Sequence, residues 1–173
     1  GLGDVYKRQF VDDNTEINEC AGCPVLHDVT GLSPMIVSIG VNRVRKVIVG
    51  KLVTNNKDIE FVTIIHPSAI MSPSAKIGEG SVVMAGAVIN ADAVIGKHCI
   101  VNTGATIDHE CVIEDFCHIA PGVHISGNTL VGEGTWIGIG SCVIQGITIG
   151  RNSVIGAGSV VVKDIPDGVV AYG

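Results

Sequence analysis

The chain has 173 residues, which suits one domain or one domain with a smaller companion. Aromatic residues make up 3% and apolar residues 46%, so any core has to be packed from aliphatic and small side chains. The net charge of −6 and the scattered 11 Lys and Arg residues argue against a nucleic-acid-binding protein. No apolar run reaches the roughly 20 residues of a membrane span and no signal peptide is recognisable, so we expect a cytoplasmic protein without membrane insertion.

The first predicted elements are short. Residues 1–9, GLGDVYKRQ, lack an initiator Met and a complete glycine-rich loop, and we expect them to be non-native sequence joined to the chain. FVDDN at 10–14 is typical of a strand end with two carboxylates at its mouth, and such Asp residues commonly cap a turn.

MIVSIG at 35–40 predicts a strand, and VNRVRKVIVGKLVTN at 41–55 predicts a helix. The helical spacing places four apolar residues on one face, expected to pack against a core: Val44, Val47, Ile48 and Leu52. Asn42 is the expected cap, and the free amides at such a helix start suit a phosphate group. The simpler interpretation, a plain cap and a plain core face, stays open.

From Ile65 the chain repeats every six residues through 17 hexads without an insertion. The first position is always Ile, Val or Met, and the fifth is nearly always Ala, Ser, Thr, Cys or Val. A period of six fits neither a helix nor an ordinary strand hairpin, and it is typical of a parallel β-solenoid.

In such a coil three hexads close one triangular turn of 18 residues. First-position side chains point inward and stack on their counterparts at about 4.8 Å, and small fifth-position residues fit near the corners. Gly, Asn and Asp at the positions between them suit the unusual backbone angles of the turns. We expect the four cysteines of the repeat to be reduced packing residues: Cys99, Cys111, Cys117 and Cys142.

This hexad pattern, over residues 64–166, resembles that of the hexapeptide-repeat acyltransferases. With FVDDN, GCPVLHDV and SIGVNRVRKVI before it, the chain resembles the sialic acid O-acetyltransferase and UDP-4-amino-sugar N-acetyltransferase family. The resemblance implies a left-handed parallel β-helix at 64–166, assembled as a homotrimer. It also implies a truncated Rossmann-like α/β domain at 10–63 that binds a nucleotide sugar, and a truncated tail at 167–173.

The stretch IDHECV places three titratable residues inside this aliphatic repeat. A histidine suits proton removal from an attacking amine or hydroxyl because its ordinary pKa, about 6.5, is close to neutral pH. An exposed histidine in a polar turn is the simpler interpretation of His109, but the match to the family's DHE or EHE segment implies the catalytic base. Glu110 is the expected assistant, while the residues alone leave Asp108 as an alternative.

Further roles are implied by the resemblance alone. The co-substrate is acetyl-CoA and no metal is expected; the implied cofactor-binding residues are His118, Gly127, Ile139 and Ala157. The implied contacts with the sugar or nucleotide sugar are Asp12, Asp13, Gly40, Asn42 and Arg45. The other histidines are interpreted as surface or turn residues: His27, His66, His98 and His124.

The leading hypothesis is therefore an acetyltransferase whose active sites lie between the subunits of a trimer. The acceptor atom, nitrogen or oxygen, stays open because both need a base. One alternative is a catalytically inactive scaffold on the same coil. A γ-carbonic-anhydrase-like metalloenzyme would need three convergent histidines, and the six-residue spacing of His118 and His124 does not suit one metal.

Overall fold

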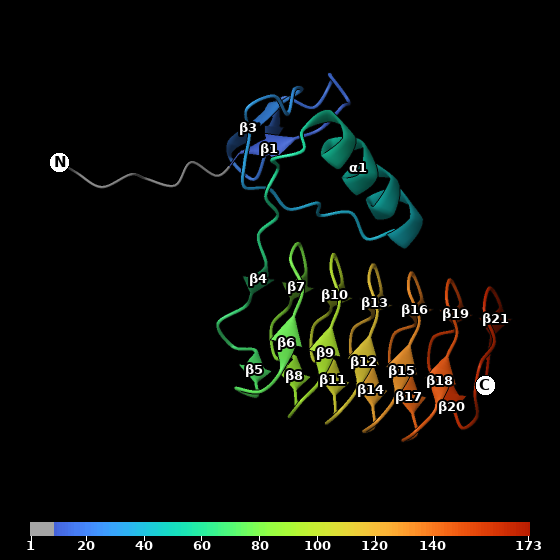
Figure 1. Cartoon of the computed structure of the whole chain (residues 1–173). Coiled ribbons are helices and arrows are strands. Elements are labelled where there is room, and N and C mark those ends of the chain that lie inside the picture. Colours follow the sequence, from blue (N-terminus) through green and yellow to red (C-terminus); the bar gives the residue numbers. More distant parts are fainter. Residues whose placement is uncertain (1–8) are drawn as a thin grey trace. The chain divides into compact units, whose positions relative to one another are not determined.

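The computed structural model describes residues 9–173, so the segment expected to be non-native lies outside these residues apart from Gln9. The chain divides into two compact units, one ending at Ser33 and one from Pro34 to Gly173. The helix at 42–55 therefore belongs to the same unit as the repeat. Figure 1 shows this helix and the successive turns of the coil.

The first unit contains a small sheet of β1 (Phe10–Val11), β2 (Glu19–Cys20) and β3 (Cys23–Leu26) in the order β1-β3-β2. β1 is parallel to β3, and β2 pairs antiparallel with β3 through Ala21 and Gly22, which both have positive φ angles. Two successive residues of this kind are what a two-residue hairpin turn requires. The Rossmann-like character of residues 10–63 stays a prediction.

The predicted helix is confirmed as α1 (Asn42–Asn55), but its details differ from expectation. Val41 occupies the N-cap position without a side-chain cap, and the predicted cap Asn42 is the first helical residue. The buried helix residues are Asn42, Arg45 and Val49, whereas Val47 is 52% exposed, so the predicted apolar face is wrong. The helix packs on turns of the coil, where carbonyl groups require hydrogen-bond donors.

The strand predicted at 35–40 is also wrong. Met35 forms only an isolated bridge with Phe61, because the chain after Phe61 leaves to start the coil at Ile64. One paired residue gives no ladder to continue.

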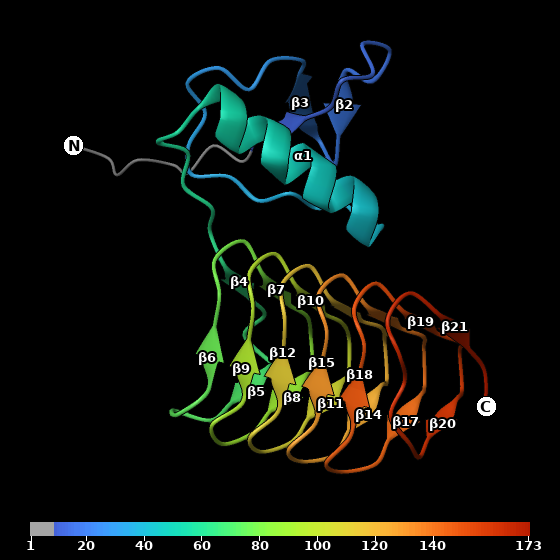
Figure 2. The ribbon, with the colours of Figure 1, turned by 45° about the vertical axis from the view of Figure 1, so that its right-hand side comes forward.

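The hexads fold into three parallel sheets (Figure 2). The first sheet contains β4 (Ile64–Ile65), β7 (Val82–Val83), β10 (Ile100–Val101), β13 (His118–Ile119), β16 (Trp136–Ile137), β19 (Val154–Ile155) and β21 (Val170–Ala171). The second contains β5 (Ile70–Met71), β8 (Val88–Ile89), β11 (Thr106–Ile107), β14 (His124–Ile125), β17 (Cys142–Val143) and β20 (Val160–Val161). The third contains β6 (Lys76–Ile77), β9 (Val94–Ile95), β12 (Val112–Ile113), β15 (Leu130–Val131) and β18 (Thr148–Ile149).

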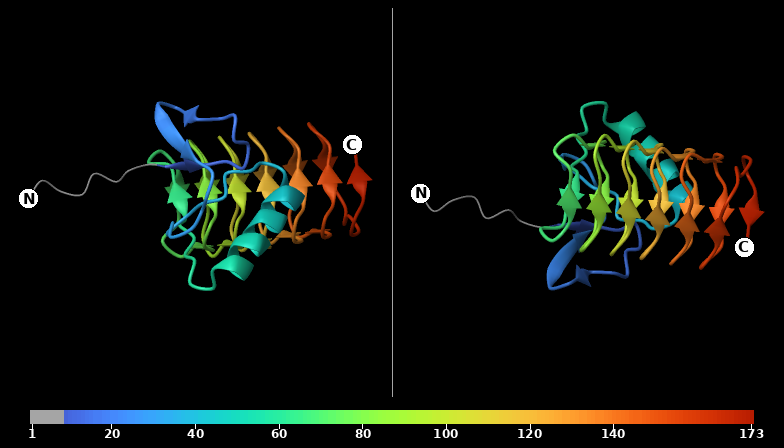
Figure 3. Two further views of the ribbon diagram at one scale, coloured as in Figure 1. Left: turned by 90° about the horizontal axis from the view of Figure 1, so that it is seen from above. Right: turned by 90° about the horizontal axis from the view of Figure 1, so that it is seen from below.

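Partner residues along each sheet are 18 positions apart, as in Ile100, His118 and Trp136. The two views in Figure 3 show the short strands in rows. The last pairing, Val154 with Val170, spans 16 residues, so the coil extends past residue 166 into the segment predicted as a tail.

Three columns of turns connect the sheets. We call the turns from first to second sheet the first corner (102–105, 120–123, 138–141, 156–159). The second corner leads from second to third sheet (90–93, 108–111, 126–129, 144–147), and the third corner from third to first (96–99, 114–117, 132–135, 150–153).

The interior confirms the predicted assignment of hexad positions. First-position residues from Val83 to Val161 are buried, and so are the small fifth-position residues. Fifth-position hydroxyls and thiols also donate to the carbonyl 15 residues later, as Thr135 does to Gly150 and Cys117 to Gly132. Cys99, Cys111 and Cys117 are buried free thiols as expected, but Cys142 is exposed because it is an outward residue of β17.

Fourth-position residues of the corners have positive φ, and most are Gly, Asn or Asp as predicted. His98, Glu110 and Phe116 are the larger exceptions. His98 is a turn residue, one of the two places predicted for it, but it is not on the surface: the side chain is 5% exposed and lies between Phe61 and Phe116, with ring centroids 4.7 and 5.0 Å away. Phe61, in the segment that follows α1, and Phe116, one turn further along the third corner, cover it.

Within residues 9–173, α1 lacks the length and apolar character needed to cross a bilayer. The cytoplasmic location stays a prediction.

Candidate active site

His109 lies in the second corner, between β11 and β12, with 57% of its side chain exposed. Its Nδ1 is 3.1 Å from Oε2 of Glu110. Because a carboxylate only accepts, Nδ1 is the donor and Nε2 carries the lone pair of the neutral ring. In this tautomer Nε2 is the ring nitrogen that can accept a proton.

Asp108 contacts the backbone of this corner and not the imidazole. Its Oδ1 accepts the backbone N–H of His109 at 2.8 Å and the side-chain amide of Asn90 at 2.9 Å. These two bonds, the backbone one first, lower the pKa of Asp108. Of the two carboxylates flanking His109, Glu110 is thus the one within hydrogen-bonding distance of the ring.

Gly127 lies one turn further along the coil beside the ring of His109. A Cβ atom at this position would lie 2.6 Å from both Cε1 and Nε2 of His109. The close approach of the imidazole therefore requires the absence of a side chain, and it brings the predicted base next to the Gly127 main chain.

Third-position N–H groups take no part in the backbone ladder of the coil between residues 9 and 173. Carboxylates accept several of them, including those of Lys97, His109 and Arg151. The N–H groups of Gly127, Ile139 and Ala157 have no partner in the described part of the chain. The three residues predicted to bind the cofactor therefore share one property, a backbone N–H that is free to donate to a ligand. Their common third position in the hexad is the sequence feature that indicates it.

Ile139 and Ala157 lie one turn apart in the first corner. The N–H of Gly158 donates to the carbonyl of Ile139 at 2.8 Å, which fixes this stacking. Both side chains are exposed, Ile139 by 57%. This free amide pair is thus accessible from outside the coil.

His118 lies on the outer side of β13 and is 8% exposed. Nδ1 is 3.2 Å from the carbonyl of Gly40, which only accepts, so Nδ1 is the donor. Nε2 then accepts from the side chain of Asn102 at 3.2 Å, and the ring stacks on Trp136. Burial lowers the pKa of His118, which favours this neutral form.

The structure thus joins Gly40, predicted to bind the acceptor, to His118, predicted to bind the donor. Sequence reasoning missed Asn102. Asn102 directly follows β10, and its side chain accepts the N–H of the next residue, Thr103. An Asn at this position of a hexad is the sequence feature that could have indicated it.

Arg45 and Asn42 hold the start of α1 on the third corner. The guanidinium is 1% exposed, and its nitrogens donate to the carbonyls of His98 and Phe116 at 2.8 and 3.0 Å. It also donates to Ile39, Gly40, Cys117 and the Asn42 side chain. Burial lowers the pKa of Arg45. Because each nitrogen already has an acceptor, the structure places Arg45 as the anchor of Gly40 and Asn42.

Asp12 and Asp13 lie in the first unit, directly after β1. Asp12 accepts the N–H of Asn14 at 2.9 Å and so caps a turn, as its type predicts. Asp13 is exposed.

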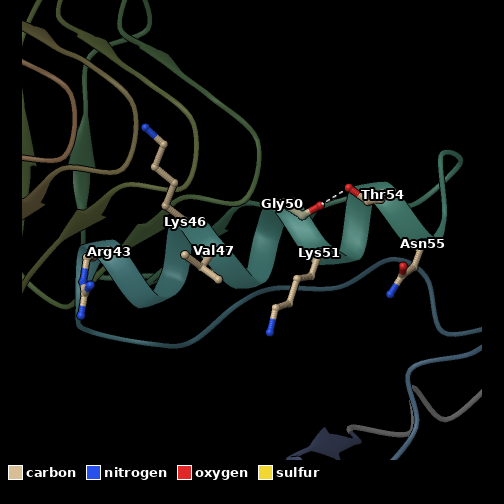
Figure 4. A pocket seen from close by; sticks show the side chains of 7 residues that line it. All are labelled: Arg43, Lys46, Val47, Gly50, Lys51, Thr54 and Asn55. Carbon is tan, nitrogen blue, oxygen red and sulfur yellow. Dashed lines mark hydrogen bonds between the residues drawn. The ribbon is translucent and has the colours of Figure 1, made fainter.

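A hollow on α1 lies away from the predicted catalytic residues. Figure 4 shows that its lining side chains all come from the helix: Arg43, Lys46, Val47, Gly50, Lys51, Thr54 and Asn55. Lys46 forms an ion pair with Glu133 of the third corner. We therefore assign the site to the corners of the coil, where base and free amides lie.

His118 and His124 lie on different sheets of the coil, first and second. In the part of the chain from Gln9 onward, no three His, Cys, Asp or Glu side chains gather in an arrangement that could hold a metal ion.

Comparison with known proteins agrees with this geometry. Residues 128–163 match the family described as bacterial transferase hexapeptide (six repeats). A UDP-N-acetylbacillosamine N-acetyltransferase of Bacillus subtilis (strain 168) is 50% identical over 50 residues, which are 29% of this chain and 22% of that protein's length.

Two solved structures are similar over most of the chain. A perosamine N-acetyltransferase from Caulobacter crescentus, a variant with one histidine replaced by asparagine in complex with CoA and GDP-perosamine, is 44% identical with a TM-score of 0.83. The match covers 88% of this chain and 75% of that one. The acetyltransferase domain of PglB from Neisseria gonorrhoeae, in complex with acetyl coenzyme A, is 43% identical with a TM-score of 0.88, covering 95% and 82%.

Three observations agree: the hexads are uninterrupted, the surface of the coil carries a histidine–glutamate pair, and each of these two solved chains is matched over more than two thirds of its length. The chain belongs to the hexapeptide-repeat acetyltransferases, which fold as a left-handed β-helix.

Proposed function

We propose that the protein transfers the acetyl group of acetyl-CoA to the amine of a nucleotide-linked amino sugar. The observation that carries the proposal is His109, paired with Glu110 and packed against Gly127. Two of the similar proteins named above are N-acetyltransferases, one named for perosamine and one for a UDP-sugar, which favours an amine over a hydroxyl.

In the proposed reaction Nε2 of His109 removes a proton as the sugar amine attacks the thioester carbonyl. Glu110 stabilises the imidazolium through Nδ1. The free N–H of Gly127, a residue beside the ring of His109, is the proposed main-chain donor for the oxyanion that forms. Collapse breaks the C–S bond and leaves a C–N bond, and the proton held by His109 passes to the departing thiolate of CoA.

Residues of the corners also provide the proposed contacts with the acetyl donor, and residues at and before α1 provide those with the sugar acceptor. The free amides of Ile139 and Ala157 suit the carbonyl groups along the pantetheine arm of CoA. Gly40, which bonds His118, and Asn42 at the start of α1 are the proposed acceptor contacts of the second unit, and Asp12 and Asp13 are those of the first.

We infer a homotrimer from the distribution of these residues. His109 and Gly127 lie in the second corner, whereas Ile139 and Ala157 lie in the first, on another edge of the same coil. A second copy that presents its first corner to the second corner of its neighbour would complete the site. Threefold repetition of such a head-to-tail contact closes a ring.

The first test is release of free CoA from acetyl-CoA in the presence of a UDP- or GDP-linked 4-amino sugar. We expect turnover by the unsubstituted protein, and His109→Ala should lower kcat by about 10²- to 10⁴-fold. His124→Ala is the matched control, because His124 is an exposed histidine of β14, and it should retain kcat.

Equal activity of His109→Ala and the unsubstituted protein would remove His109 from the mechanism. Turnover with sugar hydroxyls and not with amines would move the proposal to O-acetylation. Binding of acetyl-CoA without turnover on either acceptor would favour the inactive scaffold.

A further inference from the structure

Asn90 lies in the second corner one turn before His109, at the hexad position that Asp108 occupies in the next turn. Its side-chain amide donates to Oδ1 of Asp108 at 2.9 Å, and the structure gives this side chain no other hydrogen bond among residues 9–173. The same oxygen accepts the N–H of His109 at 2.8 Å. A continuous set of contacts therefore connects Asn90 to the backbone of the predicted base.

The corner of His109 needs such a restraint more than other corners do. Glu110 has a φ of 58°, where most equivalent positions carry Gly, Asn or Asp. His109 and Glu110 are both more than half exposed, so packing contributes little to their placement apart from the contact of the His109 ring with Gly127. The turn is held by the hydrogen bonds of Asp108, by the bond from the Glu110 N–H to the carbonyl of Ala91, and by the bond from the Asn128 N–H to the carbonyl of His109.

We propose that Asn90 is a positioning residue for acetyl transfer, acting through Asp108 on the turn that presents His109 and Glu110. The inference rests on the proposed function. Asn90 orients the Asp108 carboxylate, and the carboxylate fixes the peptide between residues 108 and 109. That peptide sets the direction from which the imidazole meets Glu110.

Asn90→Asp is the most informative single change, because it keeps the shape and replaces the donor by a second carboxylate facing Asp108. We expect it to lower kcat by about 10- to 100-fold, with Asn90→Ala less affected, as for other small displacements of a catalytic group. The KM for acetyl-CoA and the melting temperature should stay unchanged, since no donor-site or core contact is altered.

The reversed pair, Asn90→Asp combined with Asp108→Asn, separates charge repulsion from the loss of the bonds. It removes the repulsion between two carboxylates, but it cannot restore both contacts, because one atom, Oδ1 of Asp108, accepts from Asn90 and from His109. We expect the pair to regain only a small part of the kcat that Asn90→Asp loses. Ser72→Ala, one turn earlier in the same corner, removes a hydroxyl whose hydrogen bonds within residues 9–173 are to Ser74, and it should retain kcat.

Three results would overturn the inference while the proposed function stands: an active unsubstituted protein whose Asn90 variants keep full kcat, losses that follow the melting temperature, or full recovery of kcat in the reversed pair. If the unsubstituted protein itself shows no turnover, the proposed function is wrong, and the inference about Asn90 is wrong with it.

Discussion

Gly127 has no room for a side chain, because the imidazole of His109 occupies the place of its Cβ atom. A methyl group there would meet the imidazole of His109 at 2.6 Å, and the ring is the part able to move. We therefore expect Gly127→Ala to displace the ring and to lower kcat by about 10- to 100-fold, without lowering the melting temperature. Steady-state kinetics and a circular-dichroism melt of the same preparation check both.

Gly50→Ala is the control for this substitution. Gly50 lies in α1 with open space around it, so alanine should stabilise the helix by about 0.5 to 1 kcal/mol and leave kcat unchanged. A normal kcat in Gly127→Ala would show that the ring does not need its place beside residue 127.

The placement of α1 depends on Arg45 more than on apolar contacts. Replacing this buried guanidinium by Met leaves several carbonyl oxygens without a donor, including those of His98 and Phe116. We expect Arg45→Met to lower the free energy of unfolding by about 3 kcal/mol or more. Urea unfolding at a fixed protein concentration measures it.

Arg43 gives the matched comparison, since it is exposed two residues earlier on the same helix. Arg43→Met should change the free energy of unfolding by no more than about 0.5 kcal/mol. Equal losses in the two variants would contradict the anchoring role of Arg45.

The contact between α1 and the coil should also depend on pH. Burial lowers the pKa of His98 and of His118 below the ordinary value, so the unfolded chain binds protons that the folded chain does not. Stability should therefore fall as the pH drops below about 6.5. Glu79 and Asp115 oppose this effect on His98, and Arg45 and Lys97 strengthen it.

His98→Phe removes one of the titrating groups and keeps a ring between Phe61 and Phe116. The loss of stability between pH 7.5 and 5.5, measured by urea unfolding, should be smaller in this variant than in the unsubstituted protein. An identical pH dependence would exclude His98 as a contributor.

For the whole molecule, a trimer with shared sites predicts complementation. His109→Ala damages the second corner and Ala157→Trp blocks the first, so each variant alone should be inactive. In a mixed trimer of either composition, one of the three interfaces combines two intact corners, so about one third of the unsubstituted activity should return. Co-expression of two differently tagged chains followed by tandem purification tests it, and no recovery in verified mixed trimers would contradict sites shared between subunits.

The site was predictable to different degrees from residue to residue. The hexad phase places His109 in an exposed turn, and the family resemblance marks Glu110 as its assistant; the structure adds the 3.1 Å contact and the separate role of Asp108. Asn90 and Asn102 escaped prediction because their partners are 18 and 16 residues away, on the next turn of the coil.

The sequence by itself determined the coil, because each hexad position has one environment: inward and apolar, small beside a corner, or a turn with positive φ. Only the tertiary structure decided what lies against the coil. In the strand expected at 35–40, Met35 alone forms a bridge, with Phe61. The side of α1 that faces the coil carries Asn42 and Arg45, because the carbonyl groups of the corners require hydrogen-bond donors. These hydrogen bonds join segments that are far apart in the chain, so a local sequence pattern does not predict them.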